Sequence, residues 1–133
     1  MITYTKTIPS ANQLETLYAG VGWTAYTQNI TGLRQAFEHS VFITASSGTE
    51  LVGVIRGVTD RRTILYIQDL LVLPNYQHQG IATKLLQQLT VEYSTGQVVL
   101  LTDDTDIMTK FYTAVGMQAV DQHGLRAFFK DTR

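Results

Sequence analysis

The change of residue period around Pro74 is the feature that most constrains how this chain can fold. The run 63–73 is apolar on both faces, which predicts a strand covered on both sides. Pro74 ends that strand, and a polar loop with a single glycine, Gly80, follows it. Apolar residues then recur at helical spacing from Gln79 onward, at Ile81, Ala82, Leu85, Leu86, Leu89 and Tyr93. The sequence therefore predicts that a buried strand passes through a short loop directly into an amphipathic helix.

The rest of the chain predicts further helices and strands around this unit. A capping box, Ser10-x-x-Gln13, predicts the start of a first helix after a short strand at 2–5. The other predicted elements are a helix over 28–39, a hairpin of 41–45 and 50–58, a strand at 98–101, a helix from 102–106 to Gly116, and a final hairpin of 117–120 and 125–130. The predicted order is β-α-α-β-β-β-α-β-α-β-β. This is an α/β protein, more narrowly an α+β arrangement of helices on one mixed sheet.

Length and composition limit the classes of protein that fit. With 133 residues, 44% of them hydrophobic, the chain can bury one core, so we expect a single domain over 1–133. A net charge of −1 gives no basic surface for nucleic acid. Cysteine is absent, which excludes disulfides and a protein thiol nucleophile. The start of the chain resembles no secretory signal, and no apolar run is long enough to span a membrane, so we expect a cytoplasmic protein without membrane contact.

The loop before the helix at 81 predicts a site for an anion. A helix start presents N–H groups without partners and about half a positive elementary charge. Gly80 would let the backbone approach such a group closely. The residues alone also allow another interpretation, in which Gly80 only relieves a crowded turn from strand to helix.

Other motifs give weaker predictions. The stretch Gly20-Val21-Gly22-Trp23-Thr24-Ala25 has the form G-x-G-x-x-A, but it follows a predicted helix and begins no βαβ unit, which argues against a dinucleotide site. No P-loop is present. His39, His78 and His123 lack the spacing of metal ligands, so we expect no metal.

Two segments carry a resemblance to a known family. Gln77-x-x-Gly80-x-Ala82 resembles the [RQ]-x-x-G-x-[GA] signature of the GNAT superfamily of N-acetyltransferases, and Phe111–Met117 resembles its F-Y-x-x-x-G-[FM] segment. They occur in the family's order, and the predicted elements fit its fold. The resemblance implies transfer of an acetyl group from acetyl-coenzyme A (acetyl-CoA) to a primary amine. Without a cysteine, we expect direct transfer in a ternary complex.

The resemblance also implies which residues bind acetyl-CoA. The backbone of the strand before the loop would pair with the pantetheine arm, with the N–H of Leu71 directed at the thioester carbonyl. The strand residues are Leu70, Leu71 and Val72. The amides of the loop would hold the pyrophosphate, and these belong to His78, Gln79, Gly80, Ile81, Ala82 and Thr83. Thr105 stands where many members have an asparagine that bonds the pantetheine.

Two catalytic residues are implied. Tyr112 matches the family tyrosine near the coenzyme sulfur and would protonate the departing thiolate. Asp69, an acid inside an apolar strand, is the candidate base for the amine. A structural interpretation stays open for each: Tyr112 as part of a helix's apolar edge, and Asp69 as a structural hydrogen-bond acceptor. Some members carry a glutamate on the strand before the second motif where this chain has Leu100, so water could also remove the proton.

The acceptor is expected over the first two helices and the loop 20–26. Trp23 and Tyr26 could form an aromatic wall, and together with Asp69 they would suit a small cation. An alternative role for both aromatics is ordinary cover for the sheet. A small-molecule amine is preferred to a protein acceptor. The second functional hypothesis is a regulatory module that binds coenzyme A without turnover, and the final hairpin could offer an edge for a homodimer.

Overall fold

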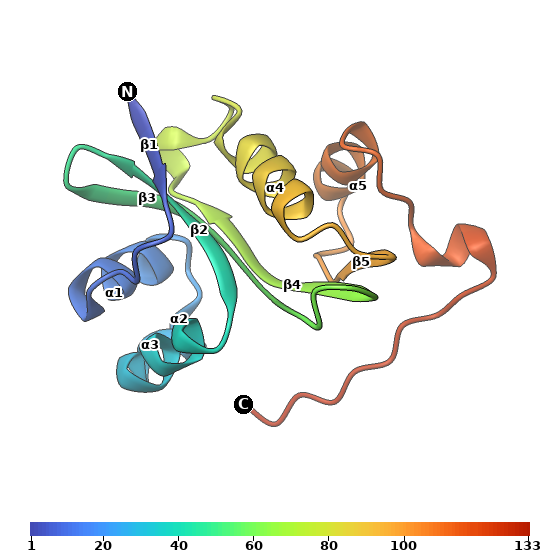
Figure 1. Ribbon diagram of the computed structural model, residues 1–133, viewed down its shortest axis with the longest axis horizontal. Coiled ribbons are helices and arrows are strands. Elements are labelled where there is room, and N and C mark those ends of the chain that lie inside the picture. Colours follow the sequence, from blue (N-terminus) through green and yellow to red (C-terminus); the bar gives the residue numbers. More distant parts are fainter. The chain divides into compact units, whose positions relative to one another are not determined.

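The computed structural model describes residues 1–133, which form two compact units, Met1–Leu100 and Leu101–Arg133. The first unit contains a five-stranded sheet with the strands in sequence order (Figure 1). Its strands are β1 (Ile2–Thr5), β2 (Val41–Ser47), β3 (Glu50–Thr59), β4 (Ile64–Val72) and β5 (Gln97–Leu100). Neighbours from β1 to β4 are antiparallel, and β5 is parallel to β4. The predicted α/β fold with a mixed sheet is therefore confirmed.

Helices cover both faces of this sheet (Figure 1). One face carries α1 (Ala11–Gly20), α2 (Thr24–Thr27) and α3 (Ile30–Glu38), and the other carries α4 (Ile81–Glu92). Val54 of β3 packs in the cluster under α1 and α3, whereas the neighbouring Gly53 faces Ile81 of α4. This is the alternation expected of a strand buried on both sides.

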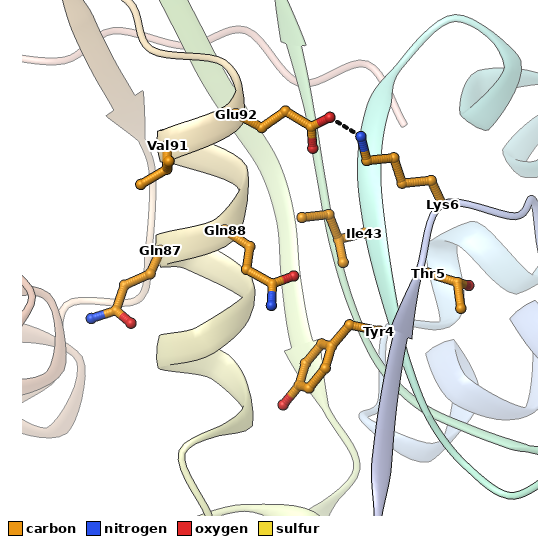
Figure 2. Close-up of a pocket in the computed structure, with 8 residues that line it drawn as sticks. All are labelled: Tyr4, Thr5, Lys6, Ile43, Gln87, Gln88, Val91 and Glu92. Carbon is orange, nitrogen blue, oxygen red and sulfur yellow. Dashed lines mark ion pairs between the residues drawn. The ribbon is translucent and has the colours of Figure 1, made fainter.

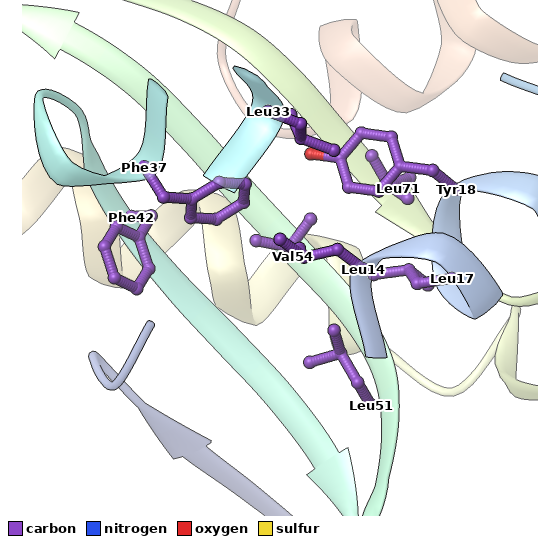
Figure 3. Packing of buried hydrophobic residues seen from close by; sticks show 9 residues of the cluster. All are labelled: Leu14, Leu17, Tyr18, Leu33, Phe37, Phe42, Leu51, Val54 and Leu71. Atoms are coloured by element: carbon purple, nitrogen blue, oxygen red, sulfur yellow. The ribbon is translucent and has the colours of Figure 1, made fainter. Parts of the chain in front are cut away.

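The helix α1 begins where its capping box predicts. The hydroxyl of Ser10 accepts a hydrogen bond from the backbone N–H of Gln13, whose side chain accepts one from the N–H of Ser10. The helix then presents Leu14, Leu17 and Tyr18 to the sheet, all fully buried. Figure 3 shows these side chains facing the residues of the sheet and α3 that complete the cluster: Leu33, Phe37, Phe42, Leu51, Val54 and Leu71.

The helix predicted over 28–39 is shorter than expected, and the loop predicted over 20–26 contains part of the short helix α2. The break lies at Asn29, which has φ −143° and caps α3 by accepting a hydrogen bond from the N–H of Gly32. A capping asparagine competes with helix continuation through its own side chain. The segment between α1 and α3 is therefore a separate turn of helix and carries Tyr26.

The second unit contains α5 (Asp106–Ala114) and a short 3-10 helix, η2 (Val120–His123). Thr105 caps α5 by accepting a hydrogen bond from the N–H of Met108, and Gly116 follows its end with φ +92°. The helix predicted between residues 102–106 and Gly116 is confirmed.

The predicted final hairpin is wrong. Residues 117–119 and 125–133 form no strand, and the expected turn over 121–124 is η2 closed by Gly124. Phe128 and Phe129 favour a strand by composition, yet they are 87% and 77% exposed. A strand forms only where a neighbouring strand satisfies its backbone, and these residues have no such neighbour. The edge that suggested a homodimer is absent, so a dimer stays a prediction.

No helix of the protein is both long and apolar enough to cross a lipid bilayer.

Candidate functional site

One edge of β4 is left open where β5 ends. The parallel pairing runs from Ile64 opposite Gln97 to Ile67 opposite Leu100, and β5 stops there. The strand β4 continues to Val72, so the stretch 68–72 has a strand on its β3 side only. Backbone N–H and C=O groups directed to the other side are therefore available to an extended ligand.

A β-bulge lies at the point where the open stretch begins. Arg56 of β3 is opposite Asp69 and Gly57 is opposite Ile67, so Gln68 of β4 has no partner in β3. An extra residue bends and twists its strand, and such bulges are frequent beside functional sites. Gln68 is exposed, and its side-chain amide donates a 3.0 Å hydrogen bond to the hydroxyl of Tyr26.

The register decides which residues of β4 face the open side. The N–H of Leu73 donates to the carbonyl of Val52 in β3. Because N–H groups of an antiparallel strand alternate in direction, the N–H of Leu71 also points to β3. The groups directed to the open side are those of Leu70 and Val72. The prediction that Leu71 offers its N–H to a ligand is therefore wrong, and Leu70 is the residue whose N–H can do so.

The loop after β4 is held by the side chain of Gln77, the first residue of the Gln77-x-x-Gly80-x-Ala82 motif. The chain turns through the 3-10 helix η1 (Pro74–Tyr76), and the side-chain amide of Gln77 then donates a 3.1 Å hydrogen bond to the carbonyl of Val72. That carbonyl lies on the open side of β4, so Gln77 ties the loop to the strand at the position where a ligand could enter.

The loop presents a row of free amides at the start of α4. No backbone N–H from His78 to Thr83 has an acceptor within the protein. Gly80 is the N-cap residue with φ +81° and no side-chain cap, and His78 is left-handed with φ +64°. A non-glycine residue in this region is uncommon and costs roughly 1–2 kcal/mol. Alternating left- and right-handed residues make concave anion sites, and the helix end adds partial positive charge.

Asp69 lies in a buried polar cluster on the α1 face of the sheet. It is 1% exposed, and its Oδ2 accepts hydrogen bonds from Nε of Arg56 at 2.7 Å and from the hydroxyl of Tyr18 at 2.9 Å. Arg56 is 6% exposed and also donates to Ser40. Burial by itself lowers the pKa of Arg56, but the adjacent carboxylate of Asp69 reverses this and the net shift is upward. The guanidinium of Arg56 is therefore charged at neutral pH.

Trp23 and Tyr26 lie beside this cluster, as the prediction of an aromatic wall requires. The ring of Tyr18 is 5.2 Å from that of Tyr26 and 6.2 Å from that of Trp23, between centroids. Burial and then the carboxylate of Asp69 raise the pKa of Tyr26, and the hydrogen bond from Gln68 opposes this. Trp23 is 37% exposed, so the aromatic group extends from the buried carboxylate to the surface.

The two remaining predicted residues belong to the second unit. Tyr112 is half-buried on α5, with its ring 4.9 Å from that of Phe111. Burial raises the pKa of Tyr112, while a hydrogen bond with Thr102 lowers it, and the net shift is upward. Its hydroxyl is therefore protonated at neutral pH. The hydroxyl of Thr105 already serves as the acceptor of the α5 cap.

Other parts of the protein add no candidate residue. No group of three or more His, Cys, Asp or Glu side chains could hold a metal ion. A hollow of about 420 Å³ lies between β1, β2 and the second half of α4 (Figure 2). It is lined by Tyr4, Thr5, Lys6, Ile43, Gln87, Gln88, Val91 and Glu92, with an ion pair between Lys6 and Glu92. None of these is a predicted site residue.

Sequence reasoning missed Arg56 and Tyr18. A signal for Arg56 was present, since an arginine interrupts the apolar run 50–58 just as Asp69 interrupts 63–73. Opposite charges in two neighbouring strands of a hairpin indicate an ion pair between the strands, on one face of the sheet. Tyr18 carried no such signal, because its spacing is that of a core residue.

Comparisons with known proteins identify the family and agree with the fold. The model of the acetyltransferase (GNAT) family matches residues 8–117. A GNAT-family acetyltransferase from Streptococcus pneumoniae TIGR4 is 34% identical, with a TM-score of 0.86 over 100% of this chain and 99% of that one. No curated protein sequence gave a significant match.

Two more distant structures share the fold. The PaiA N-acetyltransferase from Thermoplasma acidophilum, in complex with coenzyme A, is 17% identical with a TM-score of 0.70, over 89% of this chain and 90% of that one. An aminoglycoside acetyltransferase from an uncultured soil sample is 21% identical with a TM-score of 0.72, over 100% and 96%. Together, the family match over residues 8–117 and the similarity to the Streptococcus protein establish that this chain belongs to the GNAT family of acetyltransferases.

Proposed function

We propose that this protein transfers the acetyl group of acetyl-CoA to a primary amine, directly and within a ternary complex. The observation that carries the proposal is the row of free amides from His78 to Thr83, next to the open edge of β4. A diphosphate and an extended amide chain are the two parts of coenzyme A that such features bind. The fold neighbour from Thermoplasma acidophilum binds coenzyme A, which supports the same donor for this chain.

The residues fit this donor well. The amides of His78, Gln79, Gly80, Ile81, Ala82 and Thr83 would bind the pyrophosphate, and a Cβ built on Gly80 meets nothing within 4 Å, so the space in front of it is open. The backbone of Leu70 and Val72 would pair with the pantetheine, with the N–H of Leu70 directed at the thioester carbonyl. An N–H group in this position would stabilise the thioester carbonyl oxygen, on which negative charge develops during the transfer.

Tyr112 would supply the proton for the departing thiolate. Its raised pKa keeps the hydroxyl protonated at neutral pH, which is the form that an acid requires. A phenol of pKa above 10 is a weak acid toward a thiolate, so the site must bring the two groups into direct hydrogen-bond contact.

The amine has two routes for its proton, Asp69 and water. Asp69 is 1% exposed, and its Oδ2 already accepts hydrogen bonds from Tyr18 and Arg56. These contacts favour water.

The alternative is a regulatory module that binds coenzyme A without turnover. Two observations favour it: Leu100 ends β5 where some members carry a glutamate, and the hydroxyl of Thr105 is already used in a helix cap. A protein acceptor, in place of a small amine, is a further option within the enzymatic proposal.

Two measurements on the same protein sample separate these functions. Calorimetric titration with acetyl-CoA tests the donor site, and release of free thiol is then followed across a panel of small amines and lysine peptides. Binding with amine-dependent thiol release supports the transferase. Binding with no release on any acceptor supports the module, and absence of binding contradicts both.

A further inference from the structure

The unit Leu101–Arg133 has no core of its own. None of its residues is buried, and its longest helix, α5, has only nine residues. A helix shorter than about 12–15 residues is marginal in water unless its apolar side chains pack against another part of the structure. Apolar side chains of this unit are instead exposed, among them Leu101, Ile107 and Leu125. The conformation of the unit therefore depends on cover from outside it.

The last part of this unit, residues 125–130, is a strand-forming segment without a strand partner, and we call it the tail. It contains Phe128 and Phe129, which are both largely exposed. Residues 126–130 form no backbone hydrogen bond, and the chain runs on from η2 as an irregular segment (Figure 1). Their backbone groups are therefore available to a neighbouring strand.

The tail is prevented from folding back on residues 117–119. The turn that would reverse the chain is replaced by η2, and the N–H of Leu125 donates a 3.0 Å hydrogen bond to the carbonyl of Val120. Gly124 ends η2 in the left-handed conformation, with φ +70°. The tail consequently needs a partner other than the segment that precedes η2.

The strand β5 has the open edge that such a segment requires. It is the last strand of the sheet, with β4 on one side and no strand on the other. Its apolar residues Val98, Val99 and Leu100 are only partly buried. The N–H and C=O groups of an open edge are a template for a further strand.

A second copy of the chain supplies both missing partners at once. Two copies related by a twofold axis can exchange their tails, so that each open edge of β5 gains a strand and each tail gains a neighbour. Because successive side chains of a strand point to opposite faces, Phe128 would cover one face of the sheet and Phe129 the other. Four phenyl rings from two copies bury on the order of 600–1,000 Å², most of the roughly 1,200 Å² that a stable interface needs.

The charges of the two surfaces are complementary. An acidic loop with Asp103, Asp104 and Asp106 follows β5, whereas the tail carries Arg126 and Lys130. Antiparallel pairing would bring Arg126 toward this loop, and parallel pairing would bring Lys130 there. Either direction therefore places opposite charges together, which favours the correct partner over a wrong one.

We propose that this protein is a twofold dimer in which the tail of each copy adds as a strand to the open edge of β5 in the other copy. Phe128 and Phe129 make the main apolar contacts. Docking of the tail anchors the unit that carries α5, and with it Tyr112, so that a complete active site forms only in the dimer. This last step rests on the proposed function, and the dimer itself does not.

The mass of the full chain in solution is the first test. Sedimentation equilibrium should give twice the chain mass of 14.9 kDa. Phe128→Ser/Phe129→Ser should raise the dissociation constant of the dimer at least about a hundredfold, because it removes the apolar contacts. Val91→Ser changes an exposed apolar residue on α4, outside the proposed interface, and should leave the constant unaltered. A wild-type protein that is monomeric at roughly 100 μM, or equal constants in the two variants, would overturn the proposal.

Cross-linking tests whether the tail pairs with the other copy or with its own chain. The protein has no cysteine, so Gln97→Cys marks β5 alone and Ala127→Cys marks the tail alone. When the two single variants are co-expressed and treated with a short bis-maleimide, we expect a species that links one chain of each kind. A link that forms only within a chain carrying both cysteines would place the tail on its own β5 and would contradict exchange.

Turnover tests the dependence of the active site on the dimer. Phe128→Ser/Phe129→Ser should lower kcat for acetyl transfer at least about tenfold, because Tyr112 is no longer held in place. Its affinity for acetyl-CoA should change less than about twofold, since the loop from His78 to Thr83 belongs to the other unit. Phe128→Leu/Phe129→Leu should retain most of the turnover. A rate per chain that is equal in monomer and dimer would show that the dimer does not complete the site.

Failure of this inference is distinguishable from failure of the proposed function. The mass and cross-linking measurements involve no turnover, so a dimer with exchanged tails can be established even if no amine is acetylated. If amines are acetylated by a protein that sediments as a monomer, the transferase stands and the dimer does not.

Discussion

The side-chain amide of Gln77 donates a hydrogen bond to the backbone carbonyl of Val72, five residues earlier, and so joins the loop of free amides to the open strand edge. Val72 can offer this carbonyl only because the register of β3 and β4 turns it away from β3. A glutamine at position 77 is therefore explained by the geometry of the loop.

Replacing Gln77 with leucine should loosen the loop and weaken binding of acetyl-CoA about tenfold, with a loss of about 1 kcal/mol in the free energy of unfolding from the unpaired carbonyl. Calorimetric titration and urea unfolding measure the two effects. Gln35→Leu, an exposed change on α3, is the control and should alter neither. Equal donor affinity in both variants would exclude a role for Gln77 in holding the loop.

Gly80→Ala should weaken acetyl-CoA binding about tenfold or more, because its Cβ would occupy open space at the loop where we propose that the pyrophosphate binds. Gly48→Ala is a matched control in the turn between β2 and β3. Both glycines have positive φ, +81° and +60°, and open space around the added atom, so both variants should lose about 1 kcal/mol of stability. Only Gly80→Ala should lower the affinity for acetyl-CoA. A similar affinity for acetyl-CoA in both variants would argue against an anion site at this loop.

Tyr112→Phe should lower kcat for acetyl transfer about 100-fold or more and leave the affinity for acetyl-CoA nearly unchanged. The hydroxyl is protonated at neutral pH, and its removal takes away the proposed proton donor. Thiol release and calorimetry give the two values. Tyr93→Phe, whose ring lies against Arg61 in the first unit, serves as the control. The assignment fails if Tyr112→Phe turns over at the wild-type rate.

Arg56→Met should lower the free energy of unfolding by about 3–5 kcal/mol, because it leaves the buried carboxylate of Asp69 unpaired. Adding Asp69→Leu should recover most of this loss, since no isolated charge then remains. Urea unfolding of the two single variants and the double variant completes a cycle. Additive losses would mean that the two side chains do not interact as the structure places them.

Thr105→Ala should destabilise the protein by about 1 kcal/mol through loss of the α5 cap, and Thr105→Ser should retain the cap. If the hydroxyl of Thr105 also forms a hydrogen bond with acetyl-CoA, the alanine variant should in addition bind acetyl-CoA more weakly. The serine variant should keep the wild-type affinity. Unchanged donor affinity in both would limit Thr105 to its structural role.

Local sequence features account for the structural elements around the candidate site that the sequence predicted correctly. The turn after Pro74, the left-handed Gly80 and the stripe of α4 all arise from residues within a few positions of one another. The same holds for the box of Ser10 and Gln13, which fixes the start of α1. Such elements are set by backbone preference, capping and period, and these act at short range.

Apart from the early break of the predicted helix over 28–39 at Asn29, the wrong predictions depended on distant residues. Alternate N–H groups of β4 point toward β3 and away from it, and the register of the two strands decides which residues point away. The prediction for the N–H of Leu71 was wrong for that reason. The segment of Phe128 and Phe129 has strand-forming residues but no neighbouring strand. The pairing of Asp69 with Arg56 and Tyr18 joins positions 13 and 51 residues apart.

The sequence by itself determined the fold class, the loop from Gln77 to Thr83 and the family, because a glycine, a capping position and an apolar stripe act on their immediate neighbours. Only the tertiary structure decided that Arg56 and Tyr18 hold the buried carboxylate of Asp69. Strand register and helix packing bring those groups together, and both are properties of contacts between segments far apart in the chain.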